Sequence, residues 1–203
     1  MRDKVASSLL PGIAGAVVFG LLVAGILAIG QGGRTEFEQL LRRTRGERVD
    51  ERLTPAQAGY AVESRRDGRV VPLTIPEVGD APVVFLNFWG TFCPPCIEEL
   101  PSLLAMARAR QQDVVVLAVS YDESWQLIDD FFKNFTSESI PPNFLVVRDP
   151  ETVAGRDLKA LFGTEKVPES YLLRNGVVEA RYVNARDWTD PDFGGVLDEL
   201  LGR

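Results

Sequence analysis

LNFWGTFCPPCIEELP, residues 86–101, joins the end of an apolar run to the start of an amphipathic one and contains the only two cysteines of the chain. The apolar run, residues 82–89, is typical of a buried strand. A residue that precedes proline avoids the α region, so we expect Cys93 and Pro94 to be extended and Pro95 to be the first helical residue. The sequence therefore predicts a strand, a short turn and a helix with Cys93 at its N-terminus.

This position favours a reactive thiolate at Cys93. The unpaired N–H groups and the macrodipole of a helix N-terminus stabilise an anion, and such thiols have pKa values of about 3.5 to 7.5 instead of about 8.5. Cys96 follows one helical turn later, where it can attack a mixed disulfide formed at Cys93. The spacing predicts a redox-active pair; a structural disulfide or two inert thiols are the alternatives.

Histidine is absent from the 203 residues. No Cys–His dyad and no histidine-ligated metal or haem can form, and two cysteines are too few for a tetrahedral zinc site. We therefore expect no metal and no cofactor. Glu99, three residues after Cys96, is a candidate acceptor for a thiol proton; a solvated carboxylate is the alternative.

The formal net charge of −7 is unevenly distributed along the chain. Residues 1–52 carry a net charge of +2, and residues 53–203 carry a net charge of −9. An acidic domain of this kind argues against a nucleic-acid-binding surface.

Residues 9–30, LLPGIAGAVVFGLLVAGILAIG, contain no charged side chain. As a helix they would extend about 30 Å, the thickness of the hydrocarbon core of a bilayer. We predict a transmembrane anchor that follows a short N-terminal segment, residues 1–8. The alternatives are a buried helix of a soluble domain and a cleaved signal peptide, although the apolar core of a signal peptide would have only about 7 to 15 residues. The arginines after the span favour a cytoplasmic C-terminal domain by a literal positive-inside count.

The remaining chain divides into a charged segment and an α/β domain. Residues 31–54 are predicted as a juxtamembrane amphipathic helix followed by a solvated linker, and residues 55–203 as the domain. Predicted strands are a hairpin within 60–75, single strands at 82–89, 113–121 and 143–148, and a hairpin at 170–174 and 177–183. Predicted helices cover 97–110, with Pro101 as a kink, 124–135, 151–162 before Gly163, and 191–201. This alternation predicts a mixed sheet covered on both faces, a three-layer α/β domain.

Three motifs occur in order: LNFWGTFCPPCIEELP, DVVVLAVSYDES at 113–124 and KVPESYLLRNG at 166–176. Over residues 55–203 they resemble the TlpA/ResA/CcmG group of membrane-anchored, thioredoxin-fold bacterial thiol–disulfide oxidoreductases. The resemblance implies a thioredoxin-like fold with an added N-terminal β-hairpin and a central insertion, preceded by one transmembrane helix. It also implies a single-pass protein of the bacterial inner (cytoplasmic) membrane whose catalytic domain faces the periplasm, against the arginine count.

The implied activity is mainly reducing. The implied partners are protein thiol or disulfide substrates, such as apocytochrome c cysteines, and a membrane thiol reductant. A disulfide oxidase or isomerase that uses the same site remains an alternative, as does a Cu(I)-handling or non-catalytic binding module.

The resemblance also implies roles for single residues. Cys93 corresponds to the exposed nucleophile and Cys96 to the resolving cysteine. Glu99 and Glu123 correspond to acidic residues that tune the cysteine pKa values. Pro168 corresponds to a cis-proline that packs against the active-site disulfide, beside backbone that binds the partner peptide as a short added strand. The expected partner-binding residues are Trp89, Phe92, Pro94, Val167 and Pro168.

Two positions depart from the family pattern. Asn87 stands where thioredoxin has a buried aspartate. An amide cannot take up a proton, so this departure favours Glu99 as the acceptor. Phe92 stands where a tryptophan is usual before the first cysteine, which changes the surface that a partner would meet.

Overall fold

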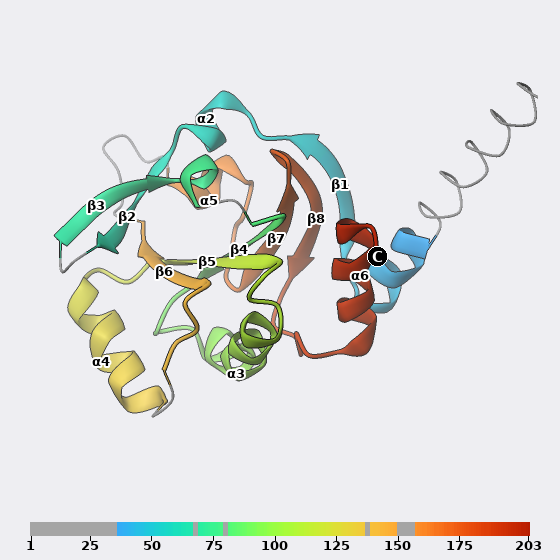
Figure 1. Cartoon of the computed structure of the whole chain (residues 1–203). Coiled ribbons are helices and arrows are strands. Elements are labelled where there is room, and N and C mark those ends of the chain that lie inside the picture. The colour runs from blue at the N-terminus through green and yellow to red at the C-terminus, as the bar shows by residue number, and fades with distance from the viewer. Residues whose placement is uncertain (1–35, 67–68, 79–80, 137–138, 150–156) are drawn as a thin grey trace, which may run out of the picture. The chain divides into compact units, whose positions relative to one another are not determined.

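The computed structural model describes residues 36–66, 69–78, 81–136, 139–149 and 157–203 (Figure 1). Residues 36–43 are helical, and residues 40–203 make up one compact unit. The predicted segments 1–8 and 9–30 lie outside the described residues. Within the described ranges, no helix is both long enough and apolar enough to cross a bilayer.

Eight strands form one mixed sheet in the order β1-β8-β7-β4-β5-β6-β2-β3. Strands β4, β5 and β6 run parallel, and all other neighbouring strands run antiparallel. Their bounds are β1 Glu47–Arg52, β2 Ala61–Arg66, β3 Arg69–Thr74, β4 Val83–Trp89, β5 Val114–Ser120, β6 Phe144–Arg148, β7 Glu169–Arg174 and β8 Val177–Val183.

Both predicted hairpins are confirmed. Strands β2 and β3 pair from Ala61 opposite Thr74 to Arg66 opposite Arg69. Strands β7 and β8 are joined by Asn175 and Gly176, whose φ angles are 51° and 73°. An Asn-Gly turn of type I′ needs this left-handed conformation at both residues, which explains why the dipeptide is a strong hairpin signal.

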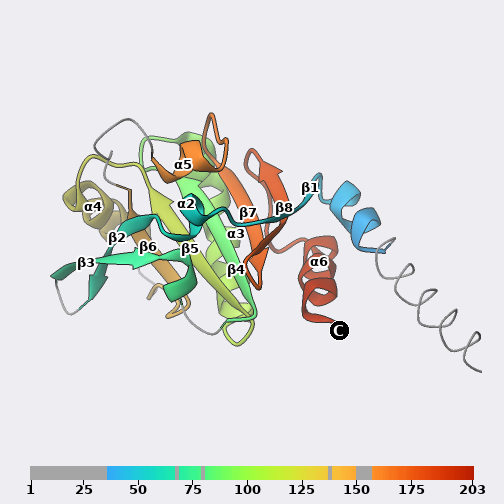
Figure 2. The ribbon, with the colours of Figure 1, turned by 90° about the horizontal axis from the view of Figure 1, so that it is seen from above.

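Helices cover both faces of the sheet, which confirms the three-layer α/β prediction. Figure 1 shows α2 and α5 on one side of the sheet and α3 and α4 on the other, and Figure 2 looks down on the side that carries α2 and α5. The elements are α2 Pro55–Ala58, the 3-10 helix η1 Ile75–Glu77, α3 Pro94–Ala109, α4 Trp125–Phe135, α5 Leu158–Leu161 and α6 Pro191–Leu201. Helix α4 and strand β6 stand between β5 and α5 along the chain.

Alternating side chains of β4 anchor the two layers, because successive residues of a strand point to opposite faces. On one face, the rings of Phe85 and Phe193 of α6 lie 6.0 Å apart, and those of Trp89 and Phe131 of α4 lie 5.7 Å apart. On the other face, the ring centroids of Phe88 and Phe162, the residue directly after α5, lie 5.8 Å apart. Strand β4 is therefore the centre of the core, and its carboxyl end leads into the cysteine motif.

The prediction of a solvated linker is wrong for residues 47–52. These residues form β1, the edge strand that pairs with β8. The register shifts between Arg48 and Glu51, where Asp50 has a φ of 58°. Most of the side chains of β1 are charged and exposed, as is usual for an edge strand that meets water, and this composition hides the strand in the sequence.

The helix predicted for residues 151–162 is seen only in part. Helix α5 covers Leu158–Leu161, and residues 150–156 lie outside the described residues. Gly163, with a φ of 70°, follows the helix in the left-handed conformation expected at its end.

Candidate active site

Cys93 and Cys96 form a disulfide at the start of α3, with an S–S distance of 2.05 Å. Cys93 is the N-cap residue, its backbone is extended, and its Sγ accepts a hydrogen bond from the N–H of Cys96 at 3.3 Å. The cysteines are 6% and 2% exposed. The predicted location of Cys93 at a helix N-terminus is confirmed.

Helix α3 begins one residue earlier than predicted, at Pro94 instead of Pro95. The ring of Pro94 already fixes φ near the helical value, and a first helical residue needs no N–H donor. The carbonyl of Cys93 accepts hydrogen bonds from the N–H groups of Cys96 and Ile97, which closes the first turn around both prolines. Pro101 lies within α3, which continues to Ala109.

Glu99 is buried on α3, with 2% of its surface exposed. Its Oε1 accepts a hydrogen bond from Nδ2 of Asn87 at 3.1 Å. Its Oε2 accepts hydrogen bonds from Nε1 of Trp188 at 3.0 Å and from the backbone N–H of Arg186 at 3.3 Å. Burial raises the pKa of Glu99 to about 7, although these hydrogen bonds and the charge of Arg186 oppose the rise. Such a carboxyl group can take up and release a proton near neutral pH.

Asn87 connects Glu99 to the sheet. It lies opposite Ser170 in the pairing of β4 with β7, and its Nδ2 also donates to Ser170 Oγ at 3.0 Å. Because the amide has no titrating proton, Asn87 orients the Glu99 carboxyl group without competing for its proton.

The peptide bond between Val167 and Pro168 is cis. Phe88 pairs with Glu169, so the register places Pro168 level with Trp89 at the carboxyl end of β4. Pro168 is buried and Val167 is half-buried. The proline loop and the start of the cysteine motif thus lie at the same end of neighbouring strands.

The other predicted site residues occupy different surroundings. Phe92 is 63% exposed, and Pro94 is also exposed, so both are available to a partner beside the disulfide. Trp89 is 2% exposed and packs against Phe131 and Phe132, so its side chain is not available for the predicted contact with a partner. Glu123 is exposed and stands apart from the hydrogen-bonded cluster of Glu99.

Asp122, the neighbour of Glu123, is a buried site residue that the sequence analysis missed. Its Oδ2 accepts hydrogen bonds from the N–H of Thr91 at 3.0 Å and from Ser120 Oγ at 2.6 Å, and its Oδ1 accepts one from Thr91 Oγ1 at 2.5 Å. These bonds fasten the loop before Cys93 to the end of β5. The available signal for Asp122 in the sequence was its position, as an acidic residue directly after the strand predicted at 113–121.

The loop between β8 and α6 was also missed. It supplies Arg186 and Trp188, two of the three residues that hydrogen-bond the carboxyl group of Glu99. The indole of Trp188 is 1% exposed and packs edge-on against Phe85 and Phe193 at 4.7 and 4.8 Å. A tryptophan in a predicted loop was the only signal of this role in the sequence.

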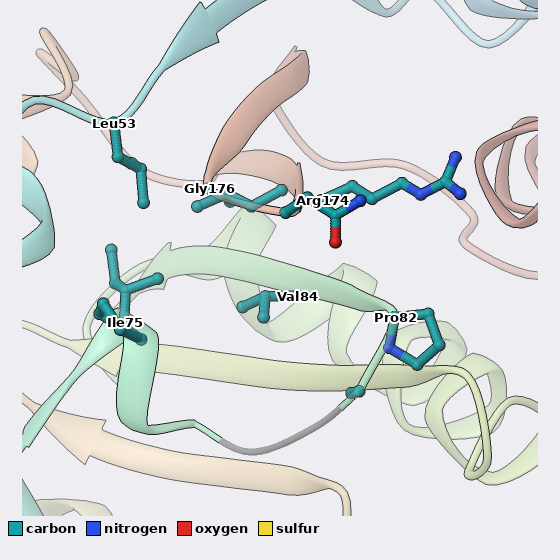
Figure 3. Close-up of a pocket in the computed structure, with 10 residues that line it drawn as sticks. Leu53, Ile75, Pro82, Val84, Arg174 and Gly176 are labelled. Atoms are coloured by element: carbon teal, nitrogen blue, oxygen red, sulfur yellow. The ribbon is translucent and has the colours of Figure 1, made fainter.

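A separate cavity of about 360 Å³ lies at the amino end of β4, the far end from Cys93. Figure 3 shows Leu53, Ile75 and Val84 lining this cavity, while the guanidinium of Arg174 points away from it. Because it lies at the opposite end of β4, this cavity is not part of the disulfide site. Among the described residues, no three Cys, Asp or Glu side chains gather in a way that could hold a metal ion.

Known proteins that resemble this chain include two that are named as a thiol-disulfide oxidoreductase and a thiol:disulfide interchange protein. Residues 81–177, which include both cysteines and Pro168, match the family described as thioredoxin-like (Thioredoxin_8). The thiol-disulfide oxidoreductase ResA of Bacillus subtilis (strain 168) is 32% identical over 91 residues, which are 44% of this chain and 46% of that protein. The thiol:disulfide interchange protein DsbE of Pseudomonas aeruginosa is 30% identical over 126 residues, 58% of this chain and 63% of that protein.

A crystal structure assigned as the thiol:disulfide interchange protein DsbE from Chlorobium tepidum superposes with a TM-score of 0.52 at 24% identity. The match covers 77% of this chain and 96% of that chain, and at this identity it concerns the fold. The chain therefore spans 46% and 63% of the two curated relatives, and nearly the whole of the solved domain.

Proposed function

We propose, since this chain has a thioredoxin-like domain with homologues of the ResA and DsbE type, that it is a thiol–disulfide oxidoreductase acting on other proteins. One observation carries the proposal. The Cys93–Cys96 disulfide lies at the N-terminus of α3, and the same helix carries the buried carboxyl group of Glu99, whose pKa is about 7. Nucleophile, resolving thiol and proton acceptor are thus supplied by one helix.

The reaction begins with the reduced protein. The Cys93 thiolate attacks one sulfur of a partner disulfide, and the other partner sulfur leaves as a thiolate. Cys96 then loses its proton to Glu99 and attacks Sγ of Cys93 in the mixed disulfide, which releases the second partner sulfur. Two electrons pass from the Cys93–Cys96 dithiol to the partner, and the product is the intramolecular disulfide of this structure.

The partner is expected to bind across the loop of Pro168. Backbone beside a proline at a strand end can pair with an extended peptide as a short added strand. Phe92, exposed next to Cys93, offers an aromatic contact to the same peptide. The partner class that we propose is a protein with a pair of oxidised cysteines that must be reduced, such as apocytochrome c.

We also propose that residues 9–30 anchor the protein in the bacterial inner membrane, with the domain on the periplasmic side. The uncharged length of this segment supports the anchor, and the resemblance to the TlpA/ResA/CcmG group supports the orientation. Protein disulfides form in that compartment, so a reductase there has substrates. A membrane thiol reductant would return Cys93 and Cys96 to the dithiol state.

A partner-trapping experiment tests this function in intact cells. In Cys96→Ala, Cys93 can form the mixed disulfide but nothing resolves it, so partner proteins are expected to accumulate in covalent complexes that dithiothreitol releases. Because Cys93 is then the only cysteine, a membrane-impermeant maleimide is expected to label its free fraction in unbroken cells.

The control is the double variant Cys93→Ala with Cys96→Ala, which should yield neither complexes nor label. Absence of dithiothreitol-sensitive complexes from Cys96→Ala would contradict the exchange function. Labelling that requires permeabilised cells would contradict the periplasmic orientation alone.

A further inference from the structure

We propose that Arg186 is a positioning residue for Glu99. Its guanidinium clamps the loop between β8 and α6, so that this loop hydrogen-bonds the Glu99 carboxyl group and favours its ionised form. The inference rests on the proposed function, because it concerns the proton acceptor of the exchange reaction. Neither the cysteine motif nor the resemblance to known families identifies this arginine.

The guanidinium of Arg186 binds backbone carbonyl groups from two separate parts of the chain. Its Nη1 donates to the carbonyl of Thr44, just after the first described helix, and its Nη2 donates to the carbonyl of Val183, the last residue of β8, at 2.6 Å. The group also lies over the rings of Tyr182 and Trp188, at 4.9 and 5.6 Å from their centroids. A planar fork of donors suits such a two-carbonyl clamp better than the ammonium of a lysine does.

The clamped loop reaches Glu99 through two donors. The N–H of Arg186 and the indole Nε1 of Trp188 both point at Oε2 of Glu99. Ser102 fastens the same loop to α3, since its Oγ accepts a hydrogen bond from the N–H of Trp188 at 3.1 Å and donates to the carbonyl of Glu99 at 2.8 Å. The guanidinium therefore holds one end of the loop while α3 holds the other.

Arg186 is also the cation that faces Glu99. Within the part of the chain that the structure describes, its guanidinium has no carboxylate partner in an ion pair, so its charge is not neutralised locally. Burial lowers the pKa of Arg186, and the charge of Glu99 opposes that change. The attraction between the two charges favours ionised Glu99.

The other polar groups around Glu99 do not replace this cation. Asn87 of β4 is neutral, and Tyr182 of β8 shares a hydrogen bond with Thr44 Oγ1. Asp187 is held by Thr189, and Glu98 is exposed on α3. A cavity of about 590 Å³, lined in part by Glu98, Glu99, Arg186 and Asp187, lies beside this cluster.

The test follows the ionisation of Glu99 directly, in the full chain, by carbon-13 NMR of labelled glutamate side chains. The Glu99 signal is assigned by its loss in Glu99→Gln. In Arg186→Gln we expect the midpoint of the Glu99 titration to rise by about one pH unit, so that the ionised fraction of Glu99 at pH 7 falls about fivefold. The rate of disulfide reduction at pH 7 should fall by the same factor. Arg186→Lys, which keeps the charge but loses the fork, should show a smaller shift.

Arg110→Gln is the matched control, because Arg110 binds Asp198 and the carbonyl of Gly194 on α6 instead of the Glu99 loop. It should leave the midpoint unchanged. An unchanged midpoint in both Arg186 variants would overturn the inference. If the Glu99 midpoint shifts in the Arg186 variants but the wild-type protein reduces no disulfide at any pH, the role of Arg186 is supported and the proposed function is refuted instead.

Discussion

Replacing Cys93 by serine is expected to reduce the rate of protein disulfide reduction to that seen without the protein. A serine hydroxyl group is not ionised near neutral pH and does not form a mixed disulfide. Serine is, however, a favoured N-cap residue, so its oxygen can accept the hydrogen bond that Sγ now accepts from Cys96 and α3 should be retained. The loss is measured as the appearance of thiols in a disulfide-containing protein substrate.

Cys96→Ser is the matched control. It keeps the Cys93 nucleophile, so it should consume one equivalent of substrate and stop at the mixed disulfide. Circular dichroism distinguishes loss of chemistry from loss of fold in both variants. Continued turnover by a folded Cys93→Ser protein would show that the exchange does not begin at Cys93.

Glu99→Gln is expected to stabilise the oxidised protein at alkaline pH while it slows the reaction. The pKa of Glu99 is raised from 4.5 to about 7, so the folded state binds this proton more tightly than the unfolded chain does. The resulting stabilisation is complete below about pH 4.5 and is lost as the pH rises through 7. At pH 8 the buried carboxylate therefore costs about 3 kcal/mol, which a neutral glutamine would not cost.

The measurement is the free energy of unfolding by urea at pH 5 and at pH 8. Wild type should lose stability between these values, and Glu99→Gln should lose much less. Glu98→Gln, one residue away and exposed on the same helix, should follow wild type. If Glu99→Gln shows the full wild-type loss of stability between the two pH values, Glu99 is not the group responsible.

Together these two substitutions separate the roles on α3. Cys93 supplies the nucleophile at the helix N-terminus, where backbone N–H groups favour its thiolate. Glu99 lies deeper, in a site that destabilises its own charge. The protein thus carries a carboxyl group that lowers stability at alkaline pH. The proposed function of this group is to accept the proton of Cys96.

Local chemistry explains why the motif and its strand and helix were predictable. An apolar run followed by consecutive prolines determines where β4 ends and α3 begins, within one residue. The Asn175-Gly176 turn likewise determines its own hairpin, because both residues tolerate the left-handed conformation. Each of these features depends on neighbours in the sequence.

The surroundings of Glu99 depend on distant residues and were not predictable. Its donors Arg186 and Trp188 are 87 and 89 positions away along the chain, and only folding brings their loop to α3. Asp122 was missed for a different reason, since the resemblance implies a role only for its neighbour Glu123. At the end of β5, a shift of one residue changes which carboxylate is buried and which is exposed, and the sequence does not define that shift. Strand β1 was missed because an edge strand of charged residues lacks an apolar pattern.

The standard reduction potential of the Cys93–Cys96 pair tests the central claim most directly. It is obtained by equilibrating the protein with dithiothreitol or glutathione buffers at pH 7 and counting free thiols. A protein reductase is expected to have a value between about −270 and −200 mV, towards the thioredoxin end of the known range. A value near −120 mV would instead indicate an oxidant, and a value below about −300 mV, typical of structural disulfides, would contradict an exchange function altogether.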